Sequence, residues 1–415
     1  MLITYLYNVD DKNGTIWIAI PAMDEMGFIE ACFDSLEQQE CQYPLFVVIC
    51  VNQPDDWWQR KDRITVCHEN KKLLMWLSTH KERYSFGLHI IDRSSPGNGW
   101  STKEAGVGMA RKVCMDYIVS VARNSDVIVS LDADTLLDHH YLRSVMEKLQ
   151  CRKDIIALST PYYHSLTGNP AVDRALIRYE CYLRTYLINM ITIRSPYAFT
   201  ALGAAIALRV ESYCKIGGIT PRPFTEDFYL LQKLAKAGTI GLSLGARVYP
   251  SARLSSRVMV GTGPALMSGV NNDWQKYPIF HPALFLRVQK LYDSFPLLFE
   301  KHVETQADVF IEKLFGTADI WSTIRNNSTS VHRFVNALHQ RFDGLRIFQW
   351  LRYLHQEYEY PNDVINLREN IRLHHGFVAV TEGDFDFINT AVDTLSEIRD
   401  LLFEIETKKR IFYDA

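Results

Sequence analysis

The stretch that decides the fold reads DVIVSLDAD and covers residues 126–134. Its apolar part is continuous and has the length of a strand that helices cover on both faces, as in a parallel sheet. Two aspartates, Asp132 and Asp134, follow directly. Because ligands of open α/β sheets bind outside the carboxyl ends of the strands, this stretch predicts a binding site that contains two carboxylates.

Further apolar runs of strand length lie upstream, and segments with helical periodicity separate them. We predict strands over residues 15–20, 45–51 and 88–91, with a helix over about 28–39. Pro21 is expected to end the first strand. The polar residues Asn52 and Asp92 follow the second and third strands, as Asp132 follows the fourth. This alternation predicts an α/β fold with a mainly parallel sheet and crossover helices.

The sequence changes character beyond about residue 280. Few glycines remain there, and apolar residues recur at three- and four-residue spacing. One such stripe comprises Val392, Leu395, Ile398, Leu401, Leu402 and Ile405. We therefore predict an α/β domain over residues 1–280 and a mainly α-helical region over residues 281–415.

Composition excludes several classes of protein. The 415 residues carry a net charge of only -3, which is not the balance of a polybasic protein that binds nucleic acid. Eight scattered cysteines without a C-x-x-C pair are expected to be reduced. Met1–Asp10 has no secretory pattern, and no apolar stretch has the length of a membrane span. A cytoplasmic protein is expected, and a lipid acceptor would bring it to the inner membrane face.

Asp132 and Asp134 are candidate metal ligands. If the backbone remains extended there, residues two apart point to the same side, and carboxylates about 6 Å apart repel by roughly 2 to 3 kcal/mol. A bound cation would reverse that cost. Mg²⁺ and Mn²⁺ suit the pair because they take a few protein carboxylates and fill the remaining positions with phosphate and water. The alternative is that both aspartates only satisfy backbone donors of a turn.

A second acidic cluster is Thr225-Glu226-Asp227, which precedes a helical segment over 228–237 that Gly238 closes. Thr225 is the expected N-cap, and acidic residues in a first turn also interact favourably with the helix dipole. The functional interpretation makes Glu226 and Asp227 catalytic, with Asp227 as the base that accepts a proton from an acceptor hydroxyl.

A glycine-rich stretch over residues 94–112 lies between these clusters and the early strands. Its glycines would allow close approach of a phosphate to a helix start, where Lys103 and Arg111 could neutralise a diphosphate. A nicotinamide site is the weaker alternative, since the G-x-G-x-x-G pattern is incomplete and does not follow the first strand. Flexible-loop and helix-packing glycines are the structural alternative.

Together these motifs resemble glycosyltransferase family 2, whose members share the GT-A fold, and the match runs from Ile16 to about Gly263. The motifs that carry it are residues 18–25, Val51-Asn52, Gly106 to Arg111, Asp132-Ala133-Asp134 and Thr225-Glu226-Asp227. The resemblance implies transfer of a sugar from a UDP- or GDP-sugar to a hydroxyl acceptor, such as a glycan or glycolipid, in polysaccharide or glycoconjugate synthesis.

The resemblance also implies roles for individual residues. Asp134, with Asp132, would hold Mn²⁺ or Mg²⁺, and Asp227 would be the base of an inverting displacement. The residues that would bind the nucleotide sugar are Pro21, Ala22, Glu25, Asn52, Asp92, Lys103, Arg111 and Asp132.

Two departures from the family pattern limit these implications. The Q-x-x-R-W signature and the membrane helices of processive members are missing, which favours a non-processive enzyme. Many relatives supply a late histidine as a third metal ligand, whereas the comparable stretch here, Tyr249–Arg257, has none.

Two other functions remain as alternatives. A sugar nucleotidyltransferase uses a similar sheet and metal, but would carry a glycine- and arginine-rich loop where this chain has residues 21–25. A catalytically silent sugar-nucleotide-binding scaffold would not require both acidic clusters.

Overall fold

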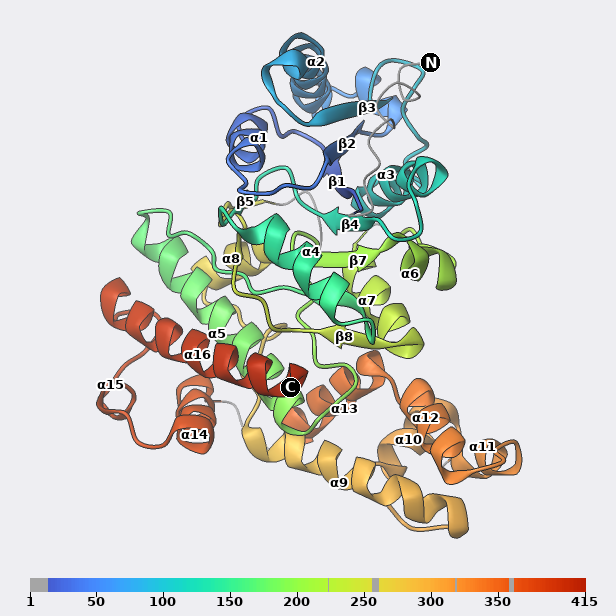
Figure 1. Ribbon diagram of the computed structural model, residues 1–415. Coiled ribbons are helices and arrows are strands. Elements are labelled where there is room, and N and C mark those ends of the chain that lie inside the picture. The colour runs from blue at the N-terminus through green and yellow to red at the C-terminus, as the bar shows by residue number, and fades with distance from the viewer. Residues whose placement is uncertain (1–13, 223, 256–260, 318, 358–361) are drawn as a thin grey trace. The chain divides into compact units, whose positions relative to one another are not determined.

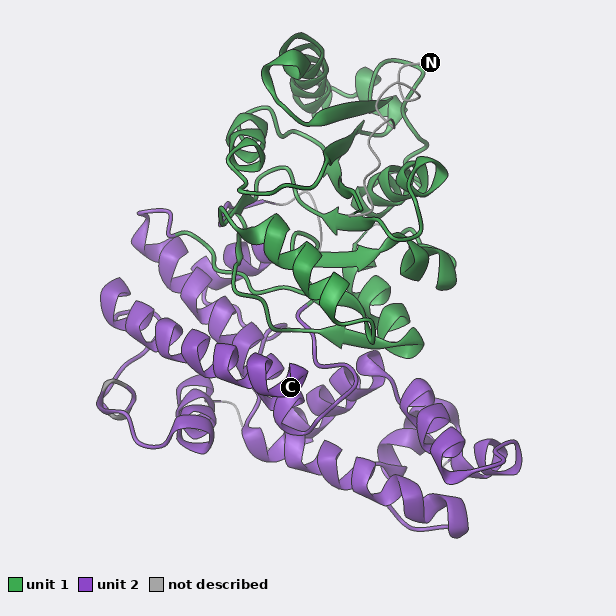
Figure 2. Ribbon diagram, in the orientation of Figure 1, with its two compact units in different colours: residues 1–165, 201–251, 257–261 green, residues 166–200, 252–256, 262–415 purple. Residues whose placement is uncertain are grey.

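The computed structural model describes residues 14–222, 224–255, 261–317, 319–357 and 362–415 (Figure 1). The N-terminal stretch Met1–Asp10, which has no secretory pattern, lies outside these residues. Arg257, the last residue of the stretch compared with the relatives' histidine, also lies outside them. The chain forms two compact units (Figure 2): residues 1–165, 201–251 and 257–261 form the first, and residues 166–200, 252–256 and 262–415 the second. The domain boundary at residue 280 stays a prediction; in the structure the second unit also includes residues 166–200.

A seven-stranded sheet organises the first unit, in the order β3-β2-β1-β4-β7-β6-β8. All its pairings are parallel except those of β7, which is antiparallel to both β4 and β6. β5 and β9 pair separately. The strands are β1 Ile16–Ala22, β2 Leu45–Asn52, β3 Gly87–Arg93, β4 Val127–Ser130, β5 Leu136–Leu137, β6 Ile155–Ser159, β7 Ile206–Arg209, β8 Thr239–Gly241 and β9 Val248–Tyr249.

Helices flank this sheet, so the predicted α/β fold with a mainly parallel sheet is confirmed. The helices of the first unit are α1 Ile29–Glu37, α2 Ile64–His80, α3 Val107–Val121, α4 Tyr141–Cys151, α6 Val210–Lys215 and α7 Glu226–Ala237, with short 3₁₀ helices η2 Asp55–Gln59 and η3 Lys81–Arg83.

Pro21 does not end the first strand, contrary to the prediction. β1 continues to Ala22, and Pro21 pairs with Cys50 of β2. On the other side of β1 the ladder with β4 ends at Ala19, whose carbonyl accepts a hydrogen bond from Leu131 N. Backbone groups of residues two apart point to the same side of a strand, so the backbone nitrogen of Pro21 faces the same side as Ala19. Proline has no N–H to donate there, but β4 has already diverged on that side. No ladder bond is lost there.

The start of β4 is fixed by one buried carboxylate, that of Asp126. It accepts hydrogen bonds from the backbone N–H of Thr15 at 3.0 Å and from the indole of Trp17 at 3.2 Å, both at the start of β1. It also accepts from the backbone and the guanidinium of Arg123. Asp126 therefore aligns β4 with β1, and this alignment determines where the carboxyl ends of the two strands lie.

The second unit is helical, as predicted for the C-terminal region. On α16, Leu395, Ile398, Leu402 and Ile405 of the predicted stripe are buried. Within the described residues no helix is both long and apolar enough to cross a bilayer. The helices are α5 Pro170–Thr192, α8 Thr262–Val270, α9 Pro282–Glu300, α10 Asp308–Phe315, α11 Trp321–Asn326, α12 Val331–Arg341, α13 Gly344–Glu357, α14 Asp363–His375, α15 Ala379–Glu382 and α16 Val392–Asp414.

α5 and α16 share a buried network of charges. Arg184 of α5 donates to Glu180 on its own helix and to Glu406 of α16, both at 2.8 Å, and Arg410 of α16 donates to Glu406 at 2.7 Å. The charges balance within the network, which is the condition for burying them. It joins two helices that lie more than 200 residues apart in the sequence.

We expect Asp126→Ala to lower the free energy of unfolding of the chain by about 3 kcal/mol, because it leaves buried donors of Thr15 and Trp17 without an acceptor. Asp62→Ala is the matched control: its carboxylate pairs with Arg60 on the surface, where an ion pair contributes little to stability. Thermal and urea-induced unfolding of both variants measure the effect. Equal stability of the two variants would contradict the role of Asp126.

Candidate active site

The candidate site lies at the carboxyl ends of β4, the central strand of the sheet, and of its neighbour β1 (Figure 1). The chain places β2 and β3 on one side of β1 and then returns to place β4 on the other side. This is the point where the strand order reverses, and α/β sheets bind ligands in the crevice at such a point. Asp132 and Asp134 follow β4 there, and Glu25 follows β1.

The aspartate pair lies on a turn, so the condition of an extended backbone is not met. Thr135 N donates to Asp132 O at 3.1 Å, which closes a turn over residues 132–135, and Ala133 is buried between the half-buried aspartates. β4 has ended at Ser130 and β5 does not begin until Leu136, so none of the strands in the described residues holds this segment extended. The separation of the two carboxylates cannot then be derived from strand geometry.

The aspartates nevertheless share their surroundings with Glu25. The thiol of Cys32, on α1, has a pKa that burial raises, and the negative charges of Asp134, Glu25 and Asp132 raise it further. Cys32 therefore marks a place to which carboxylates from the ends of β1 and β4 both come close. Sequence analysis did not identify Cys32, because none of the eight cysteines has metal-ligand spacing.

Arg111 of α3 links the two acidic clusters that the sequence predicted. Its guanidinium donates to Asp132 Oδ1 at 2.8 Å and to Glu226 Oε1 at 3.1 Å. It also donates to the carbonyl of Gly203 at 3.2 Å and to the hydroxyl of Ser130. The side chain is 2% exposed. Protein groups thus engage most of its five N–H donors, and Arg111 lies beneath the carboxylates rather than at an open phosphate position.

Gly203 and Ser130 complete this support, and sequence analysis missed both. A Cβ on Gly203 would lie 2.4 Å from Arg111 Nη2, so a larger residue would displace the guanidinium. The buried hydroxyl of Ser130 donates to Gly203 O at 2.6 Å and accepts from Arg111. Only the pairing of β4 with the distant β7 brings these residues together, and no local pattern signals it.

Glu226 and Asp227 begin α7, as predicted, but Thr225 does not cap the helix. Its backbone is left-handed, with φ 64° and ψ 16°, and its hydroxyl donates to the carbonyl of Phe224. This conformation is rare for a β-branched residue and costs of order 1–3 kcal/mol. Instead of a cap, the turn presents Asp227, whose Oδ1 accepts from Phe228 N at 2.7 Å.

The carboxyl group of Asp227 has an unusual pKa. Its side chain is half-buried, and this burial raises the pKa. The neighbouring carboxylate of Glu226 raises it further, the charge of Arg111 offsets part of the effect, and the resulting pKa is about 7. A base with a pKa near neutral pH has the strength that proton transfer from a hydroxyl requires.

The remaining predicted residues divide into two groups. Pro21 and Ala22 are buried at the end of β1, where Asn52 Nδ2 donates to Ala22 O at 3.0 Å and joins the ends of β1 and β2. Among the described residues, no contact connects Asp92 or Lys103 with the carboxylate cluster. Lys103 is exposed on the loop before α3.

Asp92 stabilises the loop that follows β3. It accepts hydrogen bonds from the backbone N–H groups of Ser94 and Ser95 and from the amide of Asn98. Burial raises its pKa, but these hydrogen bonds outweigh burial and lower the pKa overall. The carboxylate therefore acts within its own loop.

The glycine-rich helix start is filled by the chain itself. Gly106 precedes α3 with φ 137°, and a Cβ on Gly108 would lie 2.2 Å from the carbonyl oxygen of Arg222. Gly108 is thus required because another backbone segment packs against it. This is the structural alternative that the sequence left open for the motif.

Asp132 and Asp134 offer the oxygen donors that Mg²⁺ or Mn²⁺ prefers, and these ions complete their coordination with phosphate and water. The described part of the chain contains no group of three or more histidine, cysteine, aspartate or glutamate side chains arranged around a metal position. Tyr249–Ser255, the described part of the stretch compared with the relatives' histidine, has no histidine. The two carboxylates fit a metal that the substrate helps to hold.

No family model and no curated protein matches the chain. Several solved structures are similar to it at a low level. S. aureus TarS 1-349 in complex with UDP-GlcNAc has a TM-score of 0.41 and 12% identity, covering 83% of this chain and 91% of that chain. GalNAc-T7 with UDP, GalNAc and Mn²⁺ has a TM-score of 0.39 and 12% identity, covering 80% and 58%.

A third similar structure is glucosyl-3-phosphoglycerate synthase from Mycobacterium tuberculosis in complex with Mn²⁺, UDP and glucosyl-3-phosphoglycerate. It has a TM-score of 0.35 and 13% identity, covering 66% of this chain and 80% of that chain. Likenesses at this level do not assign the chain to a family.

The raised pKa of Asp227 predicts that wild type and Asp227→Asn differ in stability by an amount that depends on pH. Because the folded state keeps a proton that the unfolded chain releases near pH 4, wild-type stability falls as the pH rises from about 4 to about 7. Asparagine imitates the protonated carboxyl at every pH. We expect Asp227→Asn to raise the Tm relative to wild type by an amount that grows over this range and is constant above about pH 8.

Thermal unfolding across this pH range measures the difference. Asp293→Asn, at an exposed position of α9, is the matched control and should show no such trend. A Tm difference for Asp227→Asn that is independent of pH would contradict the raised pKa.

Proposed function

We propose that this chain is a glycosyltransferase of GT-A type, related to family 2, that moves a sugar from a nucleotide diphosphate donor to a hydroxyl acceptor. The observation that carries the proposal is the bridge formed by Arg111 between Asp132, which follows β4, and Glu226, which is next to Asp227. This bridge supports the proposal that carboxylates suited to a metal and a carboxylate with the pKa of a base act in one site.

In this proposal Asp134 and Asp132 hold Mn²⁺ or Mg²⁺, which when bound offsets the charge that develops on the departing diphosphate. Asp227 accepts the proton of the acceptor hydroxyl as its oxygen attacks the anomeric carbon and the bond from that carbon to the diphosphate oxygen breaks. Attack from the face opposite the leaving group inverts the anomeric configuration. Arg111 and Glu226 position Asp132, at the metal, relative to Asp227, at the acceptor hydroxyl.

The nucleoside of a UDP- or GDP-sugar is assigned to the ends of β1 and β2. Pro21, Ala22 and Asn52 meet there through the Asn52–Ala22 hydrogen bond, and Glu25 follows β1 directly. We assign Lys103, on its exposed loop before α3, and Asp92 to the same donor pocket from the resemblance alone. The acceptor is a hydroxyl of a glycan or glycolipid, and transfer is non-processive.

We expect release of nucleoside diphosphate from a UDP- or GDP-sugar in the presence of Mn²⁺. Asp227→Asn should lower kcat by about 10²- to 10⁴-fold and leave the Kd of the donor within about twofold, since a general base acts on the acceptor. Asp134→Asn should weaken metal-dependent donor binding as well as turnover. A panel of UDP- and GDP-sugars with calorimetric donor binding tests these effects, with Asp293→Asn as the control.

Three outcomes of this panel would contradict the proposal. Full turnover in Asp134→Asn and Asp227→Asn would remove both assignments. Donor binding without turnover on any acceptor would favour the scaffold, and release of pyrophosphate from a nucleoside triphosphate would favour the nucleotidyltransferase.

The pH profile of turnover tests Asp227 separately. We expect kcat/KM to rise with pH through an apparent pKa of about 7, because only the ionised carboxylate accepts a proton. Glu226→Gln removes a negative charge that raises the pKa of Asp227, so the rise should move to lower pH. A profile that Glu226→Gln leaves in place would show that another group is the base.

A further inference from the structure

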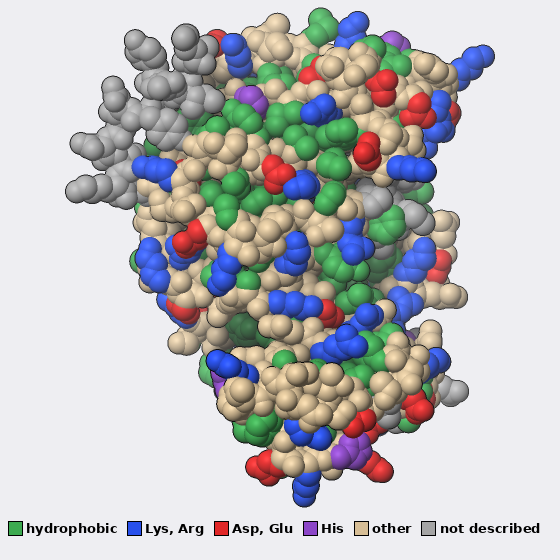
Figure 3. All heavy atoms as spheres, turned by 90° about the vertical axis from the view of Figure 1, so that its right-hand side faces the viewer, with side chains coloured by type: hydrophobic (Ala, Val, Ile, Leu, Met, Phe, Trp, Pro, Cys, Tyr) green, Lys and Arg blue, Asp and Glu red, His purple; other side chains and the backbone are tan. Residues whose placement is uncertain are grey.

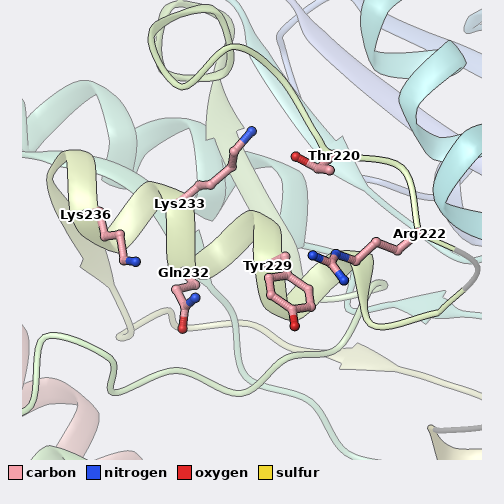
Figure 4. Close-up of a pocket in the computed structure, with 6 residues that line it drawn as sticks. All are labelled: Thr220, Arg222, Tyr229, Gln232, Lys233 and Lys236. Carbon is pink, nitrogen blue, oxygen red and sulfur yellow. The ribbon is translucent and has the colours of Figure 1, made fainter. Parts of the chain in front are cut away.

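A cavity outside the candidate active site lies on the outward side of α7. Its volume is about 220 Å³, and its lining comes from two adjoining parts of the first unit (Figure 4). Tyr229, Gln232, Lys233 and Lys236 line it from α7, where their spacing of three, four and seven residues places them on one helix face. Thr220 and Arg222 line it from the segment that leads into the helix.

The lining is cationic and rich in hydrogen-bond donors. Three of its six side chains carry a positive charge, none is a carboxylate, and the others contribute hydroxyl and amide groups. Within the described part of the chain, neither Arg222 nor Lys233 forms an ion pair. Figure 3 shows that basic side chains outnumber acidic ones across the middle of the face turned to the viewer. Such a lining attracts an oxyanion and has no group that repels it.

The cavity is also held in shape by contacts of its own. The guanidinium of Arg222 stacks on the ring of Tyr229, 3.7 Å from its centroid, and the backbone of Arg222 packs against Gly108 without room for a Cβ. Lys233 extends toward Thr220 and donates to Gly218 O at 2.8 Å, and Gln232 is only 7% exposed (Figure 4). Less side-chain entropy is therefore lost on binding than at a set of freely moving surface lysines.

From these observations we propose that the cavity binds a phosphate group, with Arg222 and Lys233 as the principal ligands. A planar guanidinium can donate two parallel hydrogen bonds to phosphate, and ammonium groups supply the remaining charge. A phosphate dianion matches three cationic side chains better than a carboxylate with one charge. This site is separate from Asp227 and Glu226, since neither of them lines the cavity.

The proposal does not depend on the proposed function, and it has a direct test. Calorimetric titrations with inorganic phosphate, glycerol 3-phosphate and acetate, at low and at physiological ionic strength, measure binding to the full chain. We expect saturable binding of both phosphates and at least about tenfold weaker binding of acetate. Stronger binding of glycerol 3-phosphate identifies a phosphate ester as the ligand, and equal or weaker binding identifies free phosphate.

Variants assign the binding to the cavity. Arg222→Ala should weaken phosphate binding about tenfold, and Arg222→Ala/Lys233→Ala should remove one bound phosphate per chain. Lys215→Ala is the matched control: Lys215 belongs to α6 and donates to Ala237 O at 3.2 Å at the end of α7, but does not line the cavity. Arg222→Lys keeps the positive charge but loses the two parallel N–H donors of the guanidinium, so it should bind phosphate with intermediate affinity.

Thermal unfolding of each variant checks that it folds. If Arg222→Ala does not fold, Lys233→Gln is used in its place. An unchanged number of bound phosphates in the double variant would overturn the proposal. So would an equal loss of affinity in Lys215→Ala, which would reflect net charge alone, or equal binding of acetate.

Discussion

The interaction on which the site depends is the burial of one guanidinium, that of Arg111, among acidic and carbonyl groups. Transfer of a cation from water into protein is costly, and burial by itself lowers the pKa of this group. Asp132 and Glu226 reverse that effect and keep the guanidinium charged. The ion pairs are therefore mutually required: without Arg111, Glu226 would be a buried carboxylate without a counter-charge.

This one side chain also connects parts of the fold that the chain order separates. Arg111 lies on α3, Ser130 at the end of β4, Gly203 before β7 and Glu226 at the start of α7. Its hydrogen bonds hold these elements at the carboxyl edge of the sheet, where an aspartate turn and a left-handed residue, Thr225, leave the local backbone without regular support. The rigid element of the site is thus a buried charge and not a strand or helix.

The sequence predicted what local periodicity and residue type determine. The four predicted strands up to residue 131, the helix after the first of them, the buried stripe of α16 and the position of Glu226 and Asp227 at a helix start all follow from patterns within short stretches. The predictions that failed depended on distant partners: Pro21 remains in β1 because β4 diverges, and the aspartates form a turn where none of the described strands pairs with them. Gly203 and Ser130 gave no local signal at all, since their roles arise where β7 pairs with β4.

The charges of the site explain why a carboxyl group there has a pKa near neutral pH. One guanidinium faces a larger number of carboxylates, and Asp227 is the group on which burial and the charge of Glu226 act together. An excess of negative charge at the end of β4 would repel a diphosphate, which is itself an anion. For the donor of the proposed function, a cation would offset this repulsion, and Asp132 and Asp134, both half-buried, would supply oxygen ligands for it. The excess of negative charge that raises the pKa of Asp227 is therefore also the physical argument for the divalent metal of the proposed function.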